Sequence, residues 1–261
     1  MLSLTYYFLK SIIKNSCFEY FNKHYNLNYF VRNFLHFIFL LTFFMSFSQK
    51  NIHHRWNNDL KKYVSNNGHV NYKLWNKNKS NLDAYINLLS QFPPEDKSSK
   101  SHKISFWINA YNALTVKLIL SNYPIKSIKE INSPWKTKCF KSRGVNYSLD
   151  DIEHKILRKL NEPRIHFAIN CASKSCPKLL NEAYTEKKLN NQLNEVTISF
   201  LNDNSKNKLD ENKSAISKIF LWYGSDFGSK KMMLDFISRY SKINIQRSKL
   251  NYLPYNWELN E

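Results

Sequence analysis

The sequence predicts an α+β fold in a single domain, with several helices around a small mixed sheet. Apolar residues at helical spacing dominate the first part of the chain, and short apolar runs separated by further helical segments follow. The 261 residues are 43% apolar, which is enough for one large core, and they contain no internal repeat or low-complexity linker. We therefore expect one domain over residues 49–261, preceded by an N-terminal extension with a signal or anchor segment in residues 1–48.

The segment Asn33–Gln49 is uncharged and rich in Phe, Leu and Ile. Its apolar part has about the length of a signal-peptide core and is short for a complete membrane span. Ser46 and Ser48 supply small residues at the −3 and −1 positions if cleavage precedes Gln49. The segment predicts export to the periplasm or cell envelope, through a cleaved signal peptide or an uncleaved anchor. Membrane contact through this segment is expected only if it stays uncleaved.

Three helices are predicted in the first half of the domain: residues 56–64, Leu82–Leu89 with Asn81 as N-cap, and residues 105–120. A loop over Phe92–His102 separates the last two. The helix at 105–120 is apolar on more than one face, so we expect it to be central and buried. Buried amides need hydrogen-bond partners, and we expect Asn109 and Asn112 on this helix to pin neighbouring loops.

The second half alternates strands and helices. A hairpin is predicted around Gly144, and the next helix, residues 148–160, carries acidic residues in its first turn. The remaining elements expected from the sequence are a buried strand at Ile165–Asn170, a helix at Thr185–Leu201, a strand at Ser214–Leu221, a helix at Lys231–Tyr240 and an extended aromatic tail.

The net charge of +19 raises the question of a nucleic-acid or lipid partner. The lysines are spread over all segments and form no basic run interleaved with aromatic residues, so we expect no nucleic-acid partner. The chain has only 4 Gly and no Gly-rich phosphate loop, which argues against nucleotide chemistry. We expect no cofactor and no metal.

Five motifs occur in a fixed order: FWINAYNAL (106–114), SLDDIEH (148–154), IHFAINCASKSCP (165–177), FLND (200–203) and YNWELN (255–260). In these motifs the chain resembles the family known as domain of unknown function 547, over about residues 70–257. The resemblance implies an exported bacterial protein. It supplies no established reaction, so the chemistry has to be argued from the residues.

Cys171 and Cys176 lie in one of these motifs, a few residues after His166. If the leader is removed, Cys139 is the third remaining thiol, so at most one disulfide can form. Four interpretations of the cluster stay open. They are a thiolate nucleophile with an imidazole base, a Cys171–Cys176 disulfide with Cys139 free, a zinc site completed by two histidines, and ordinary buried packing.

The nucleophile interpretation makes Cys176 and Cys171 the candidate nucleophiles, His166 and His154 the candidate bases, and Glu153 a group that orients the imidazole. Asn109, Asn112, Trp107 and Tyr111 are the candidate substrate-binding residues, although Trp107 and Tyr111 also suit a core or a pocket wall. We expect the pocket where the 105–120 helix, the 150–160 helix and the 165–177 segment converge.

Two functions follow from these alternatives. The first is a cysteine-dependent hydrolase or transferase that acts on a peptide-like amide or ester. The second is a non-catalytic binding module of the envelope in which the two cysteines are oxidised. Whether the protein is an enzyme depends on which of them holds, and its partner is an unidentified envelope substrate or protein.

Overall fold

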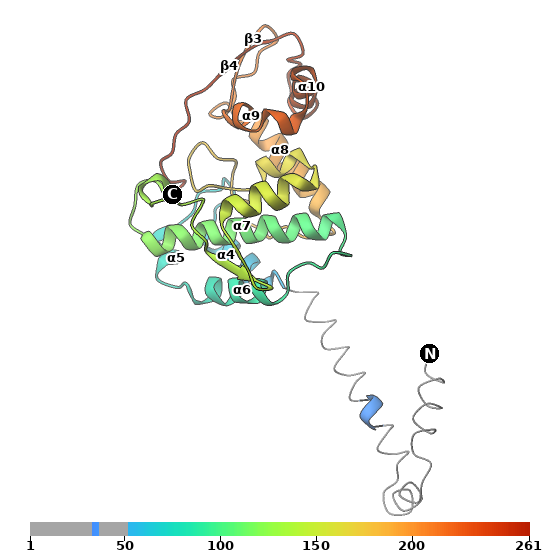
Figure 1. The fold of residues 1–261 in the computed structure, drawn as a ribbon. Coiled ribbons are helices and arrows are strands. Elements are labelled where there is room, and N and C mark those ends of the chain that lie inside the picture. Colours follow the sequence, from blue (N-terminus) through green and yellow to red (C-terminus); the bar gives the residue numbers. More distant parts are fainter. Residues whose placement is uncertain (1–32, 37–51) are drawn as a thin grey trace, which may run out of the picture. The chain divides into compact units, whose positions relative to one another are not determined.

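The computed structural model describes residues 33–36 and 52–261, and Ile52–Glu261 form one compact unit (Figure 1). Most of the predicted signal segment lies outside the described residues, so the predicted export signal stays a prediction. Within the described part of the chain, no helix has both the length and the apolar character needed to cross a membrane.

The structure is mostly helical. The first half consists of α4 (His54–Tyr63), α5 (Tyr72–Asn76), α6 (Ser80–Gln91) and α7 (Lys100–Asn122), followed by the short helix η1 (Ile128–Glu130). The second half contains η2 (Asp151–Leu157), η3 (Arg158–Leu160), η4 (Pro163–Phe167), α8 (Leu189–Leu201), α9 (Ile219–Trp222), η5 (Gly224–Phe227) and α10 (Lys230–Tyr240).

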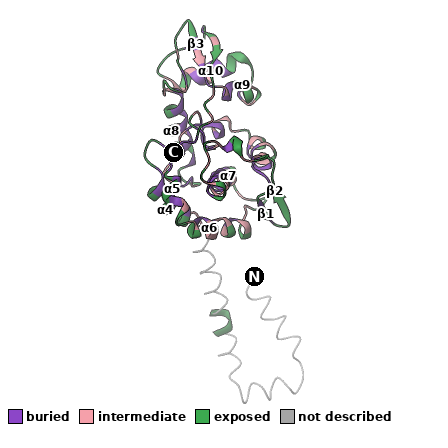
Figure 2. Cartoon of the chain, turned by 90° about the vertical axis from the view of Figure 1, so that its left-hand side faces the viewer, coloured by how far each residue is buried: buried purple, intermediate pink, exposed green. Residues whose placement is uncertain are grey.

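Helix α7 runs through the middle of the unit, as the sequence predicts (Figures 1 and 2). It begins five residues earlier than expected because Ser99 caps it, its side chain accepting a hydrogen bond from the His102 amide at 3.0 Å. Buried residues occur on all its faces between Ile104 and Val116. Helices α5 and α6 and the segment η2 pack against it, so α7 is the element around which these three are arranged.

The single mixed sheet predicted from the sequence is wrong. The described residues contain two separate two-stranded sheets. Strands β1 (Phe140–Ser142) and β2 (Val145–Tyr147) form the expected antiparallel hairpin, with Gly144 in the turn at φ 79°. Strands β3 (Lys213–Ile216) and β4 (Lys249–Tyr252) pair in parallel, so β3 is shorter than predicted and is followed by the helix α9.

The predicted strand at Ile165–Asn170 is also wrong, because Pro163–Phe167 form the 3₁₀-helix η4. Pro163 occupies its first turn, and the Glu162 side chain accepts a hydrogen bond from the Arg164 amide at 3.2 Å. Ile165, His166 and Phe167 are all buried. An apolar run that is buried on every side shows no periodicity from which strand and helix could be distinguished.

The predicted helix at 148–160 is present but has an unusual geometry. Asp151–Leu157 form a π-helix, in which the Arg158 amide bonds to the Glu153 carbonyl five residues earlier, and the 3₁₀-helix η3 follows. Asn161 ends the segment in the left-handed conformation at φ 49°. Such π segments often occur at functional sites.

Two other helix boundaries differ from the prediction. The N-cap position of α6 is occupied by Lys79 and not by Asn81, whose amide instead lies 3.5 Å from the Asp59 carboxylate. Residues 185–188 are not helical, so α8 begins at Leu189 rather than at Thr185.

Replacing Trp107 by Ala should lower the free energy of unfolding by about 3–5 kcal/mol, as large aromatic truncations in cores do. The side chain is 7% exposed and its ring contacts those of Phe106, Phe140 and Tyr147. Urea denaturation at neutral pH would measure the change. The half-exposed Trp222→Ala provides the control and should lose much less, whereas a loss below about 1 kcal/mol at Trp107 would contradict this packing.

Candidate functional site

A cavity of about 490 Å³ lies where η2, the 166–177 segment, α9 and the C-terminal tail meet. The predicted site residues Tyr111, Glu153, His154, His166, Cys171 and Cys176 all line it. The rest of the wall is largely aromatic and apolar, and consists of Ser133, Pro134, Trp135, Lys136, Asp150, Ile169, Pro177, Ile219, Trp222, Tyr223, Tyr255 and Trp257. The structure therefore brings the predicted catalytic residues together, in the place expected from the sequence.

Cys171 and Cys176 are joined by a disulfide, with their Cα atoms 6.4 Å apart, and Cys139 is free and exposed. Of the four interpretations of the cluster, the disulfide is the one that the structure shows. The chain reverses at Ala172, which has a φ of 60°. A bonded pair offers neither the thiolate nucleophile nor the two thiolate ligands that the nucleophile and zinc interpretations require.

The C-terminal tail holds the loop that the disulfide closes. The Lys174 amide donates to the Glu258 carbonyl at 2.7 Å, and the Ser175 amide donates to the Asn256 carbonyl at 3.2 Å. The Tyr255 hydroxyl lies 3.5 Å from the Cys171 sulfur and 3.3 Å from the Cys176 sulfur. Within residues 52–261, none of the hydrogen bonds of either sulfur goes to an imidazole.

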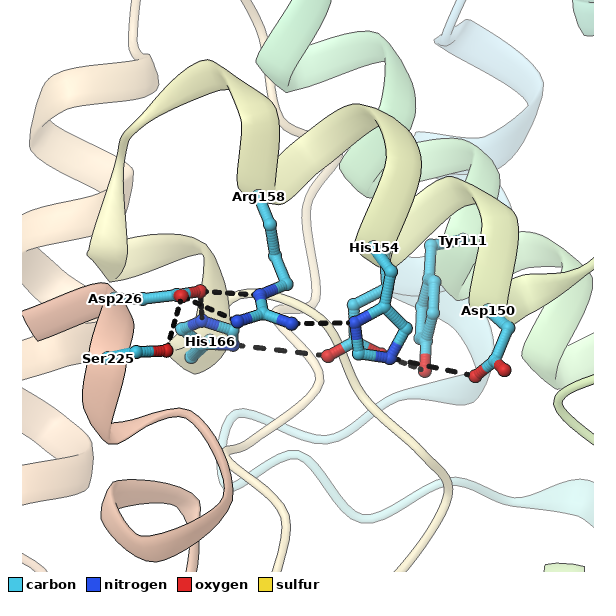
Figure 3. A network of polar contacts seen from close by, with 8 residues as sticks. Tyr111, Asp150, His154, Arg158, His166, Ser225 and Asp226 are labelled. Atoms are coloured by element: carbon cyan, nitrogen blue, oxygen red, sulfur yellow. Dashed lines mark hydrogen bonds and ion pairs between the residues drawn. The ribbon is translucent and has the colours of Figure 1, made fainter.

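Both candidate histidines are held by charged groups in one polar network (Figure 3). His166 Nε2 lies 2.8 Å from Asp226 Oδ2, and since a carboxylate accepts, this nitrogen carries the proton of the neutral ring. The Arg158 guanidinium binds both oxygens of Asp226 at 2.6 Å and donates to His154 Nδ1 at 2.8 Å. Arg158 therefore fixes the orientation of His154 as well as that of Asp226.

The other nitrogen of His166 faces Glu153. Nδ1 of His166 lies 4.0 Å from Oε1 of Glu153, and neither atom has a hydrogen-bond partner within the described residues. Their side chains are 1% and 6% exposed. The hydroxyl of Tyr111 donates to the other oxygen of Glu153 at 3.5 Å, and the ring of Tyr223 stacks on that of His166 with centroids 4.2 Å apart.

Burial changes the protonation of this pair in opposite directions. Burial lowers the pKa of His166 to about 4, against the opposing effect of Asp226, so its imidazole is neutral at neutral pH. Burial raises the pKa of Glu153 above its usual value. Beside them, the Arg158 guanidinium lowers the pKa of Asp226 to about 2. The network thus combines one firmly ionised carboxylate with one whose charge is destabilised by its surroundings.

Three of the candidate substrate-binding residues lie outside the cavity lining. Asn109 bonds to the amide and carbonyl of Tyr184 at 3.0 and 2.8 Å, and Asn112 bonds to the Asn170 amide and the Ala168 carbonyl at 2.9 and 3.0 Å. These contacts confirm that the two asparagines pin neighbouring loops. Trp107 packs in the core, whereas Tyr111 lines the cavity beside Glu153.

Several residues of the site were not predicted from the sequence. Asp226 in η5 and Arg158 in η3 organise the histidines, and Tyr223, which lies between α9 and η5, covers His166. The i, i+4 spacing of His154 and Arg158 was the one signal available, because it places both side chains on one helix face. Trp222 and Trp257 also line the cavity.

Residues 95–201 match the model of a family described as "Protein of unknown function, DUF547". The match is narrower than the resemblance over about residues 70–257, and it contains η2 and the disulfide loop but not the tail residues that close the cavity. No curated protein and no solved structure matches the chain.

Lowering the pH from 7 to 4.5 should destabilise the protein partly through His166. Its pKa is about 4 in the folded state and 6.5 ordinarily, so the unfolded chain binds a proton below pH 6.5 that the folded chain rejects. This contribution is complete above pH 6.5 and is lost as the pH falls towards 4. The free energy of unfolding lost in this way at pH 4.5 is about 2 kcal/mol.

Urea denaturation of the wild type and of His166→Asn at both pH values would isolate this contribution. His53, whose pKa is also lowered to about 4 by burial, contributes to both proteins alike. The stability of the variant should therefore fall by less than that of the wild type. Equal losses would show that His166 is not held neutral.

Proposed function

Because the chain contains a domain of the DUF547 family at residues 95–201, a family of unknown function, we propose a function from the cavity itself: the protein is an exported binding module for a small organic ligand. The observation that carries this proposal is a cavity of about 490 Å³, lined largely by aromatic and apolar residues, with a buried polar pair in its wall. Ligand sites usually combine a mostly apolar lining with a few placed polar groups.

The aromatic wall supports recognition of a flat or apolar ligand face. The rings of Trp222, Tyr255 and Trp257 pack together with centroids 4.5–5.8 Å apart, and Trp135 contacts Trp257 at 5.7 Å. Trp222 is 44% exposed although it is a large aromatic residue. Exposed aromatic area beside a cavity is available for a ligand to cover.

The disulfide favours a binding function over a catalytic one. It ties Cys171 to Cys176 in the wall and constrains the loop between them, and the tail bonds to that loop on one side. A pre-ordered wall reduces the entropy lost on binding. Structural disulfides persist in oxidising compartments, which agrees with export to the periplasm or envelope, with any membrane contact made by the N-terminal segment.

A cysteine-dependent hydrolase or transferase is the second candidate. What favours it is that Cys171, Cys176, His154, His166 and Glu153 line the same cavity. This function requires that the disulfide is reduced first, and that an imidazole then reaches a sulfur. The substrate would be a peptide-like amide or ester that enters the aromatic cavity.

Wild-type protein incubated with a small-molecule extract of the host envelope should retain a ligand that native mass spectrometry detects as a discrete mass addition. Trp222→Ala removes part of the aromatic wall and should lose most of this addition. Phe92→Ala is the matched control, since Phe92 is 49% exposed and lies outside the cavity. Absence of any retained mass, or equal retention by Trp222→Ala, would contradict the binding function.

Iodoacetamide labelling with peptide mapping distinguishes the two candidates. Without reductant, Cys139 should be labelled and Cys171 and Cys176 should not, because a disulfide sulfur is not alkylated. After mild reduction both should be labelled. Selective labelling of Cys171 or Cys176 below pH 7 in untreated native protein, abolished by His166→Ala or His154→Ala, would favour the enzyme instead.

A further inference from the structure

Glu153 is a buried carboxylate that no Lys or Arg side chain of residues 52–261 pairs with directly. Its Oε1 atom has no hydrogen-bond partner within the described residues, and its side chain is 6% exposed in the cavity wall. The guanidinium of the network, Arg158, is already bonded to both oxygens of Asp226 and to His154. Burying a charge is costly unless a partner offsets it.

Nδ1 of His166, which also has no hydrogen-bond partner in the described part of the chain, is an acceptor as well. Because His166 Nε2 donates to Asp226, Nδ1 of the neutral ring carries a lone pair towards Glu153. Two acceptors 4.0 Å apart are close enough for one donor atom at about 2.9 Å from each to bond both. The pair is thus complementary to a group with at least two hydrogens to donate.

The charge of the cavity favours a cation. Its lining holds two carboxylates, Asp150 and Glu153, against one ammonium group, Lys136, which is exposed, in a chain whose net charge is +19. Tyr111 and Tyr223 also line the cavity, and aromatic rings can attract cations. An acidic, aromatic cavity in a strongly basic protein selects against anionic ligands and for cationic ones.

Resting on the proposed binding function, the geometry points to a ligand class: the cavity takes a small organic molecule that carries a primary ammonium group, which donates to Glu153 and His166 Nδ1. The aromatic wall formed by Trp222, Tyr255 and Trp257 holds the apolar part of the same molecule. A quaternary ammonium has the charge but no hydrogen to donate. A neutral hydroxyl has one hydrogen and no charge. Neither matches both features of the site.

Three probes that share one benzyl group and differ in the polar group test this assignment on the full chain: benzylamine, benzyl alcohol and benzyltrimethylammonium. Tryptophan fluorescence reports occupancy, because Trp135, Trp222 and Trp257 line the cavity. Benzylamine should bind at least about tenfold more tightly than either of the other probes, since hydrogen bonds between charged groups are the stronger ones.

Glu153→Gln should lower the affinity for benzylamine about tenfold and leave that for benzyl alcohol unchanged. Glu195→Gln is the matched control, with the same change of side chain and charge at an exposed position outside the cavity, and should behave as the wild type. Circular dichroism would verify that both variants are folded. The comparison of the three probes on the wild type needs no variant and stands even if Glu153→Gln misfolds.

The outcomes separate this inference from the function on which it rests. If benzyl alcohol or benzyltrimethylammonium binds as tightly as benzylamine, the ammonium assignment is wrong while the cavity still binds small molecules. If benzylamine binds but Glu153→Gln and Glu195→Gln bind it equally, Glu153 is not the recognition group and the assignment is also wrong. If no probe binds, the assignment fails, and the extract experiment alone decides whether the binding function stands.

Discussion

Two asparagines in α7 hold the segment that forms one wall of the cavity. Each amide side chain bonds to one backbone N–H and one backbone C=O, Asn112 at residues 168 and 170 and Asn109 at residue 184. The segment between these points has no helix or strand of its own and carries the disulfide loop. The backbone N–H and C=O groups at residues 168, 170 and 184 therefore find their hydrogen-bond partners in side chains of α7. Without the two asparagine amides these backbone groups would be buried and unsatisfied.

Helix α7 also positions other parts of the cavity wall. Asn170, which Asn112 holds, accepts from the Ala172 amide and donates to the Pro177 carbonyl, both at 2.7 Å, and so shapes the turn that brings the two cysteines together. The π-helix η2 packs against α7 and places Glu153 beside Tyr111. In this arrangement the Glu153 carboxylate and the His166 imidazole stay buried 4.0 Å apart without a hydrogen bond between them.

The sequence was informative wherever one residue type has a restricted set of environments. Buried amides on an apolar helix had to find partners, so the pinning by Asn109 and Asn112 was predictable. Glycine and the hydrophobic pattern located the hairpin and α7. The 165–170 segment was misassigned because burial on all sides removes periodicity, and the division into two sheets depends on pairing between β3 and β4, which are distant in sequence. The meeting of Glu153, His166 and Asp226 is a property of the tertiary structure, which no spacing within one motif specifies.

The contribution of the tail to the cavity has a consequence for the order in which the protein becomes functional. Tyr255 and Trp257 complete the wall, and Asn256 and Glu258 hold the disulfide loop, yet these residues follow all other lining residues in the chain. During synthesis the N-terminal parts emerge and fold first. The helices around α7 can pack while the tail is still unmade, but the cavity cannot close. The wall of the cavity is therefore complete only once synthesis has passed residue 257.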